Sequence, residues 1–504
     1  MTDNQELYAA RKRKLLHIRE RGENAYPYGF KYTHRLADVH RHFAAMAAAG
    51  EPGSLAAAES VSVCGRLVSW RDHGKSVFAH LEDSTARLQI YLRKDDMGES
   101  AFALLADLDI GDFAGVTGAV MRTRTGELTV KASAVTLLAK SLRPLPEKWH
   151  GLKDVDTRYR NRHMDLAANP QAREIFLARA RVIQLTRDFL NARGYTEVET
   201  PVLQPLYGGA EAEPFTTYYA SLKTTYYLRI SNELYLKRLL VGGMDRVYEF
   251  SKDFRNEGLD RMHTPEFTLL ELYEAYADYE DMMRLTEDLM RTLVKSLKGE
   301  PVLTYQGKRI DFSGPWQRIP FVRALGEKAG FDPLEGGVER LRQAAEAARI
   351  PDAGRLSRPK LLDKLFGALV QPHLDGPVFV IDHPLELSPL AKAHRHDPRL
   401  AERFEPVIAG LETGNAFSEL NDPEEQRRRF EEQQTLKRQG DADTQVMDED
   451  FVAALELGMP PAGGLGLGID RLVMILCDLT SIREAILFPQ LKPEGARPEG
   501  QADG

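Results

Sequence analysis

A polar loop between two strand-like runs carries the residues of this chain that are best suited to bind a nucleotide. In the stretch VYEFSKDFRNEGLDRMHTPEFTLLELYEAYADY (247–279), apolar and aromatic runs flank Arg255, Glu257, His263 and Phe267. A guanidinium binds phosphate oxygens and stacks on a base, and an aromatic ring offers a second stacking face. A hairpin with a solvated charged tip is the ordinary alternative, so the interpretation depends on other segments.

Three acids recur at seven-residue intervals in the segment RFEPVIAGLETGNAFSEL (403–420), namely Glu405, Glu412 and Glu419. Residues seven apart on one strand point to opposite faces, so a turn must intervene if two of these acids meet, and Gly410 provides one. Two carboxylates beside nucleotide phosphates commonly hold Mg²⁺, which keeps waters and takes other ligands from phosphate. For any single acid, the competing interpretation is an ion pair with a surface arginine such as Arg403.

The glycine-rich segment GLGLGID (464–470) leads to a further cation, Arg471. Its spacing and flanks do not match a dinucleotide-binding loop, and the chain has no Walker phosphate loop. We expect the glycines to let a strand pass close to the nucleotide and to begin the helix that carries Arg471.

The bulk composition predicts a multi-domain protein of a reducing compartment. Its 504 residues exceed one typical domain, and the net charge of −8 argues against a surface that coats nucleic acid everywhere, though not against a local basic face. The two cysteines, Cys64 and Cys477, fit no metal spacing and no disulfide framework. The N-terminus does not resemble a secretory signal, and the apolar runs are well short of the roughly 18 residues of a membrane span, so a cytoplasmic location is expected.

The elements that must position these residues begin with a small barrel. Residues 1–58 are expected to form a lead-in with a basic helix that places Leu7, Leu15 and Ile18 near one face; it could touch RNA phosphates or pack on the next domain. Residues 59–140 hold five short β-branched runs and a helical piece near 99–107, the count of an OB-fold barrel. The candidates for its nucleic-acid face are Arg66, Lys75, Phe78, Gln89 and Glu127, although a strand aromatic is more often a core residue.

Beyond a proline-containing linker (141–156), residues 157–493 predict an antiparallel sheet flanked by helices, so the fold class is α+β. A long helix is expected over 170–193, a strand with Pro201 follows, and residues 315–375 read as a small helical insertion. The tail 494–504 is rich in Pro, Gly and charge and is expected to be loose.

Three motifs of this sequence resemble those of the class II aminoacyl-tRNA synthetases. FRNEGLDRMHTPEFTLLELYEAYADY resembles motif 2, GYTEVETPVL with its preceding helix motif 1, and GLGLGIDRLVM motif 3. Five segments are similar to those of the bacterial-type lysyl-tRNA synthetases of this class. They are YGGA, RISNELYLKRL, ELYEAYADY, GNAFSELND and SIREAILFPQLKPE. The resemblance extends from the N-terminal helix to about Pro493.

The resemblance implies a role for each matching residue. Arg255, His263 and Arg471 would be catalytic, Glu405 and Glu412 would carry Mg²⁺ (up to three ions per subunit), and Arg66, Phe78, Gln89 and Glu127 would bind the anticodon. The implied ATP-binding residues are Arg255, Glu257, His263, Thr264, Phe267, Glu405, Glu412 and Arg471. The implied lysine-binding residues are Gly209, Glu233, Arg255, Glu271, Tyr273, Asn415, Phe417 and Glu419.

The implied activity is ATP-dependent ligation of L-lysine to tRNA(Lys) by a homodimer built through motif 1, without a membrane. A pocket with Glu233, Glu271 and Glu419 would select a doubly cationic amino acid and repel aspartate, and a buried carboxylate without its ammonium partner would reject neutral isosteres.

The sequence departs from the family's frequent pattern in two places. Thr264 stands where Asn is common, and Ser231-Asn232 where Ala-Pro is common. The alternatives are an aspartate- or asparagine-type synthetase, disfavoured by the acidic pocket, and a protein-lysylating paralogue, disfavoured by the barrel. A non-catalytic RNA-binding relative is disfavoured by the retention of Arg255, Arg471, Glu405 and Glu412.

Overall fold

The structure is a computed structural model that describes residues 2–49, 55–145, 154–438 and 445–493. It divides the chain into two compact units, Met1–Lys153 and Asp154–Gly504. The whole expected tail (494–504) and half of the expected linker (141–156) lie outside the described residues.

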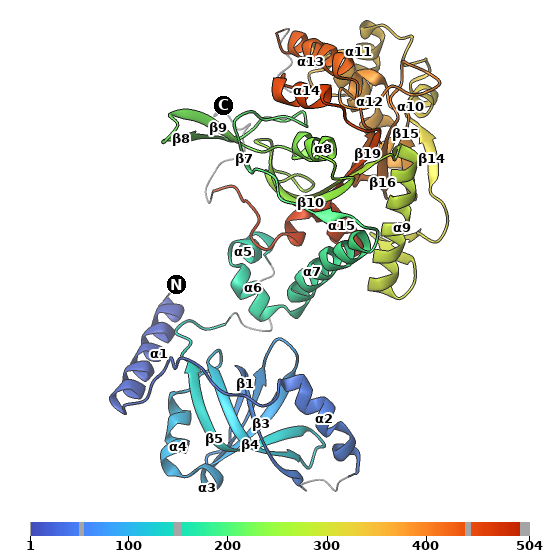
Figure 1. Cartoon of the computed structure of the whole chain (residues 1–504). Helices are drawn as coiled ribbons and strands as arrows, with labels where there is room; N and C mark the ends of the chain where they lie inside the picture. The colour runs from blue at the N-terminus through green and yellow to red at the C-terminus, as the bar shows by residue number, and fades with distance from the viewer. Residues whose placement is uncertain (1, 50–54, 146–153, 439–444, 494–504) are drawn as a thin grey trace. The chain divides into compact units, whose positions relative to one another are not determined.

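In the described part of the first unit, five strands close into a barrel (Figure 1). The order is β1-β2-β3-β5-β4, and the bounds are β1 Leu55–Asp72, β2 Ser76–Glu82, β3 Arg87–Arg93, β4 Phe113–Arg122 and β5 Leu128–Ala139. Three short helices join β3 to β4, which are α3 (Lys94–Met97), α4 (Glu99–Ala103) and η1 (Leu104–Asp107). The predicted OB-fold is confirmed, including its helical piece.

The basic helix α1 (Thr2–Glu20) packs on this barrel. Leu15 and Ile18 are buried in the barrel's hydrophobic cluster, and the Arg11 guanidinium donates to the carbonyl oxygen of Ile110 at 2.9 Å. Leu7 is 44% exposed, so it does not share the buried face with Leu15 and Ile18 as we expected. Of the two interpretations of this helix, packing on the domain is the one seen within the unit. A second helix, α2 (Leu36–Ala49), was not predicted.

The second unit is built on a large, mostly antiparallel sheet, as the sequence predicted. Its described strands run in the order β14-β15-β16-β18-β19-β11-β10-β6, with β17 paired to β16. Two pairings, β14 with β15 and β10 with β6, are parallel. The bounds are β6 Thr196–Glu197, β10 Arg246–Phe254, β11 Glu266–Ala275, β14 Gln317–Pro320, β15 Pro377–Ile381, β16 Arg403–Ile408, β17 Leu411–Glu412, β18 Gly414–Ser418 and β19 Ala462–Gly468.

Helices cover both faces of this sheet (Figure 1). On one face α7 (Pro170–Asn191), α9 (Tyr279–Lys298) and α15 (Ile469–Leu476) bury Leu270 and Leu272 of β11. On the other, α8 (Glu233–Val241), α13 (Pro423–Arg438) and α14 (Glu449–Glu456) pack around Tyr273 and Phe417. Because successive strand residues face opposite ways, the alternation in β11 sends Leu270 and Leu272 to the first core and Glu271 and Tyr273 to the second face.

Three helices between β14 and β15 have a core of their own. They are α10 (Phe321–Ala329), α11 (Val338–Ala347) and α12 (Arg358–Leu369), and Leu325, Leu341 and Leu361 form a cluster that continues onto Val378 of β15. The segment 315–375 thus contains the expected helices, but it opens with β14, a strand of the main sheet.

Shorter elements complete the second unit. They are α5 Val155–Arg160, α6 Arg162–Ala168, β7 Leu203–Gln204, β8 Thr216–Tyr219, β9 Thr224–Leu228, β12 Val302–Tyr305 and β13 Lys308–Asp311, with β7-β9-β8 and β12-β13 as small separate sheets.

Candidate active site

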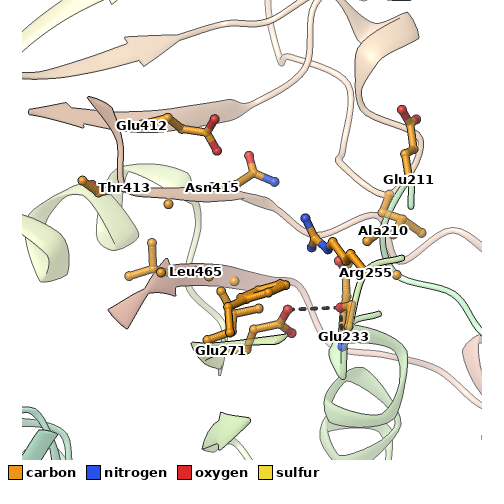
Figure 2. Close-up of a pocket in the computed structure, with 18 of the residues that line it drawn as sticks. Ala210, Glu211, Glu233, Arg255, Glu271, Glu412, Thr413, Asn415 and Leu465 are labelled. Carbon is orange, nitrogen blue, oxygen red and sulfur yellow. Dashed lines mark hydrogen bonds between the residues drawn. The ribbon is translucent and has the colours of Figure 1, made fainter. Parts of the chain in front are cut away.

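A cavity of about 480 Å³ opens on the second face of the sheet. Figure 2 shows Glu412 and Asn415 on one wall and Glu271 on the opposite wall, with Arg255 and Glu233 to one side. Every residue predicted to bind ATP or lysine, except Glu405, lines this cavity. These residues are Gly209, Glu233, Arg255, Glu257, His263, Thr264, Phe267, Glu271, Tyr273, Glu412, Asn415, Phe417, Glu419 and Arg471. The structure therefore brings together residues that lie more than 260 positions apart in the sequence, from Gly209 to Arg471.

The hairpin of β10 and β11 supplies the part of the wall that was expected to face a nucleotide. Its register ends at the pair Phe254 and Glu266, so the loop begins at Arg255, as the sequence indicated. The guanidinium carbon of Arg255 lies 5.0 Å from the centroid of the Phe267 ring, a cation–π contact. His263 is oriented by Asp260, whose carboxylate lies 2.8 Å from Nδ1.

Arg471 reaches the same wall from the first turn of α15. Its Nη1 donates to the carbonyl oxygen of Glu412 at 2.7 Å, and its Nη2 lies 3.3 Å from Nε2 of His263. The neighbouring Asp470, which we had not singled out, is buried and accepts from the backbone N of Thr268 at 2.7 Å and from Arg179 of α7 at 2.6 Å. Asp470 therefore fixes the start of α15 against β11, which sets the position of Arg471.

A turn brings Glu412 back beside Glu405, as Gly410 predicted. Ala409 and Gly410 have φ values of 51° and 78°, which is a left-handed conformation that glycine adopts without strain. Glu412 then pairs across the strands with Val407. The competing ion pair is also present, because Nη2 of Arg403 lies 2.7 Å from Glu405.

The electrostatics of this acidic pair fit a divalent cation. Desolvation inside the cavity raises the pKa of Glu412 to about 7, and the charge of Glu405 adds to the effect. Burial also acts on Glu405, but His383 and Arg403 outweigh it and hold its pKa below the ordinary value. No cluster of three or more His, Cys, Asp or Glu side chains suited to a metal occurs among the described residues. Two carboxylates alone suit Mg²⁺, which would take its other ligands from phosphates and water.

Three carboxylates lie deeper in the cavity, on Glu233, Glu271 and Glu419, and all three are buried. Burial, followed by the charges of Glu233 and Asp253, raises the pKa of Glu271 well above its usual range. Gly464 leaves room for the Glu419 carboxylate, because a Cβ at position 464 would lie 2.0 Å from its Oε1. An acidic pocket of this kind requires cationic groups to neutralise it.

Lys237 supplies one such cation, and sequence reasoning had missed it. Its ammonium is fully buried, 2.6 Å from Glu233 and 2.5 Å from Glu419. Although burial acts against its charge, these two carboxylates raise the pKa of Lys237 above the ordinary value. The signal was the i, i+4 spacing of Glu233 and Lys237 in NELYLKRLL, which places both on one face of a helix.

Arg403 and the departures from the family pattern make specific contacts. The Nε of Arg403 donates to Oδ1 of Asn415 at 2.8 Å, so the residue that pairs with Glu405 also orients the amino-acid side of the cavity. Ser231 donates from Oγ to Glu271 at 3.1 Å, and Asn232 donates to Glu249 at 2.8 Å. The Thr264 hydroxyl donates to the carbonyl oxygen of Glu266 at 3.2 Å, within its own hairpin.

In the barrel, an aromatic platform surrounds Phe78. Its ring stacks on Tyr91 with centroids 4.5 Å apart, and His73 approaches edge-on at 6.2 Å. The predicted Gln89 and Glu127 lie in one hydrogen-bonded network, since Gln89 donates to Glu127 at 2.7 Å. Sequence reasoning had missed Tyr91 and His73.

His80 is a further residue of that network that the sequence did not reveal. Its Nε2 lies 2.8 Å from the Glu127 carboxylate, and its Nδ1 lies 2.7 Å from the Ser69 hydroxyl. Strand alternation carries the signal, because residues 78 and 80 share the outer face of β2 while Val77, Ala79 and Leu81 are buried inside the barrel.

Arg66 is not brought to this platform. Its guanidinium donates to the carbonyl oxygen of Gly111 at 3.0 Å and lies over the ring of Phe113 at 4.2 Å. In the register of β1 and β2, Arg66 pairs with Glu82, whereas Arg71 is the partner of Phe78. Arg71 is exposed, so it is the arginine of β1 that the structure places beside the platform. Lys75 lies in the exposed turn that follows β1.

Comparison with known proteins defines the class of this site. A family model described as tRNA synthetases class II (D, K and N) matches residues 154–492, and an OB-fold nucleic acid binding domain matches residues 61–138. The sheet, its motifs and the cavity are those of a class II aminoacyl-tRNA synthetase.

Curated relatives narrow this class. The chain is 53% identical over 442 residues to a lysine–tRNA ligase of Aquifex aeolicus, covering 87% of this chain and 74% of that one. It is 48% identical over 491 residues to the lysine–tRNA ligase of Moorella thermoacetica (97% and 98% covered) and 49% identical over 491 residues to that of Roseiflexus sp. (strain RS-1) (97% and 99%). The chain belongs to the lysine–tRNA ligases. In the described ranges, every helix is too short or too polar to cross a bilayer.

Proposed function

We propose that this cavity activates L-lysine with ATP and then transfers it to the 3′-terminal adenosine of tRNA(Lys). The observation that carries the proposal is the division of one cavity into two charge environments. Arg255, His263 and Arg471 gather at the hairpin side, and Glu233, Glu271 and Glu419 lie together on the other. Cations suit the phosphates and carboxylate of the substrates, and carboxylates suit the two ammonium groups of lysine.

On the ATP side, Phe267 and Arg471 would hold the adenine between them. The Glu257 carboxylate would accept from the adenine amino group, and His263 would approach the γ-phosphate. Arg255, which lies over Phe267 at 5.0 Å, would turn toward the α-phosphate and the lysine carboxylate. Thr264 would contribute through the shape of the hairpin, since its hydroxyl is bonded to the backbone of Glu266.

On the amino-acid side, Glu233 and the backbone at Gly209 would receive the α-ammonium. Glu271, Tyr273 and Glu419 would surround the ε-ammonium, and Asn415 and Phe417 would line the aliphatic part. A Cβ at Gly209 would lie 2.8 Å from Oγ of Ser231, so only glycine leaves this approach open.

The chemistry needs no nucleophile from the protein. A lysine carboxylate oxygen forms a bond to the α-phosphorus while the bond from that phosphorus to the bridging oxygen breaks and pyrophosphate leaves. Arg255 stabilises charge that develops on the α-phosphate oxygens. In the second step the oxygen of a terminal ribose hydroxyl of tRNA bonds to the lysyl carbonyl carbon and gives up its proton. The bond from that carbon to the phosphate oxygen breaks, and AMP leaves with the electron pair.

Glu405 and Glu412 would hold Mg²⁺, and up to three ions per subunit would accompany ATP. When bound, Mg²⁺ neutralises the phosphate charges. The Arg403 guanidinium would orient Glu405 for that task, because it already holds this carboxylate at 2.7 Å.

The barrel would read the anticodon by stacking a base on Phe78, with Gln89 and Glu127 bonded to base edges. Arg66 was part of this expectation, and its contacts with Gly111 and Phe113 favour a supporting position for it. A cytoplasmic location is consistent with the two free cysteines, Cys64 and Cys477.

We also propose a homodimer through the elements of motif 1. Leu177 on α7 is 66% exposed, and Val202 and Leu203 after β6 are 40% and 50% exposed, so these elements offer apolar side chains that a second subunit would cover. Leu177→Arg should shift the sedimentation coefficient toward a monomer and reduce activity. An unchanged sedimentation profile would contradict this interface.

The experiment for the activity is amino-acid-dependent ATP–pyrophosphate exchange followed by charging of tRNA(Lys). Exchange with lysine, but not with aspartate or asparagine, and charging of tRNA(Lys) are expected. Exchange with aspartate or asparagine instead would favour the sister specificities, and no exchange with any amino acid would favour a non-catalytic relative.

A further inference from the structure

Lys237 is a cation of the chain itself behind the wall of the pocket proposed for a cationic substrate. It lies on α8 with its side chain fully buried, and its ammonium contacts Glu233 at 2.6 Å and Glu419 at 2.5 Å. It also lies 5.3 Å from the centroid of the Phe417 ring. Lys237 does not line the cavity itself, so it reaches these residues from behind.

A buried lysine needs a reason, because desolvating an ammonium is costly unless carboxylates repay it. Here two of them do, one from its own helix and one from the segment after β18. The other nearby acids have a cation of their own, since Arg229 lies 2.7 Å from Glu249 and 3.2 Å from Asp253. Lys237 thus serves only the carboxylates that face the amino-acid pocket.

The charges of the pocket balance only when Lys237 is counted. Glu233, Glu271 and Glu419 would carry three negative charges, and the two ammonium groups of lysine neutralise two of them. Arg255 is taken up by the substrate carboxylate. The third carboxylate charge is offset by Lys237, and among the described residues no Lys or Arg forms an ion pair with Glu271.

We propose that Lys237 is a positioning residue of the amino-acid pocket. Its ammonium holds Glu233 and Glu419 in the orientations that receive the α- and ε-ammonium groups, and it neutralises the one acidic charge that lysine cannot. The inference rests on the proposed function, because it takes the three acids as the lysine site. The alternative is an ordinary structural ion pair, whose loss would weaken the whole fold rather than lysine binding alone.

The test uses the full-length chain with Lys237→Gln, which keeps hydrogen-bond donors but removes the charge. Arg238→Gln is the matched control, since Arg238 is the next residue of α8 and pairs with Asp448 at 2.7 Å outside the cavity. The measurements are the KM values for lysine and ATP in pyrophosphate exchange, calorimetric lysine binding and the melting temperature.

For Lys237→Gln the KM for lysine should rise about 30-fold or more, as expected when one partner of a buried charge pair is removed. The KM for ATP should stay within about twofold, and Arg238→Gln should change neither. An unchanged KM for lysine, or equal increases for lysine and ATP, would overturn the proposal. Absence of lysine-dependent exchange in the unmodified chain would instead refute the proposed function.

A double-mutant cycle with Glu419→Gln guards against misfolding of the single variant, because removing both members of a buried pair is better tolerated than removing one. Because Lys237 holds Glu233 as well as Glu419, the double variant should lose more lysine affinity than Glu419→Gln alone, but less than the sum of the two single losses of binding free energy. Additive losses of lysine affinity would show that Lys237 acts independently and would overturn the proposal.

Discussion

Oγ of Ser231 donates a hydrogen bond to Oε1 of Glu271 at 3.1 Å, and this Oγ accepts one from the backbone N of Glu233 at 3.1 Å. One hydroxyl thus joins two acids of the amino-acid pocket. This residue stands where the family frequently has alanine, so the departure adds a donor at the site.

The first prediction concerns this hydroxyl. Ser231→Ala should raise the KM for lysine about fivefold, because a hydrogen bond to a carboxylate contributes on the order of 1 kcal/mol or more. Fold and ATP binding should be retained, since alanine only deletes the Oγ atom. Pyrophosphate exchange with lysine varied at saturating ATP measures the effect; a larger change in the KM for ATP than for lysine would disagree with this role.

The second prediction is that lysine binding releases a proton. In the empty pocket, burial and the nearby carboxylates Glu233 and Asp253 raise the pKa of Glu271, while Arg255 acts in the opposite sense. The hydroxyls of Ser231 and Tyr273 also face it. A lysine ammonium beside Glu271 lowers that pKa again, so affinity should increase with pH between the ordinary and the raised pKa, while the substrate amine, with a pKa of about 10.4, stays charged.

Calorimetric titrations with lysine in buffers of different ionisation enthalpy count that proton. Glu271→Gln should remove the part of the release that belongs to this carboxyl. Net uptake of protons by the unmodified protein would contradict the assignment.

The third prediction separates two arginines of one barrel strand. Arg71→Ala and Phe78→Ala should each raise the KM for tRNA, by about tenfold for the stacked ring, because base stacking contributes roughly 1–3 kcal/mol. Arg66→Ala should have a smaller effect, since its side chain is engaged with Gly111 and Phe113. Pyrophosphate exchange without tRNA should be unchanged in all three. A larger increase in the KM for tRNA with Arg66→Ala than with Arg71→Ala would contradict the placement of Arg71 beside Phe78.

The fourth prediction concerns Arg403, which holds Glu405 at 2.7 Å and Asn415 at 2.8 Å. Arg403→Lys should raise both the Mg²⁺ concentration needed for half-maximal exchange and the KM for lysine, each by about tenfold, as for other residues that orient metal ligands. Arg399→Lys is the control, because Arg399 pairs with Asp397 at 2.8 Å on the surface nearby. A change in only one of these two quantities, the Mg²⁺ requirement or the KM for lysine, would argue against a shared anchor.

Much of the fold followed from local patterns. The five β-branched runs predicted the barrel, the helix over 170–193 matches α7, and Gly410 predicted the turn that returns Glu412 toward Glu405. These features depend on short-range chemistry, such as strand alternation and positive φ at glycine, which a sequence states directly. The helix α2 was missed although its alanine-rich segment, with Asp38 in the first turn, favours a helix.

The parts that could not be predicted are contacts between distant residues. Lys237 was missed, because its partner Glu419 is 182 positions away in the sequence. Arg66 was placed on the nucleic-acid face because nothing in the sequence shows that its side chain reaches Gly111. Arg71 became visible only through the register of β1 and β2, which depends on the irregularity between Leu67 and Ser69.

The most direct test of the acidic pocket compares lysine with norleucine, which has the same carbon chain without the ε-ammonium, in ATP–pyrophosphate exchange. We expect kcat/KM for norleucine to be lower by about four orders of magnitude, because Glu271 would be left buried without a cation. Comparable exchange with both amino acids would contradict the claim that these carboxylates select lysine.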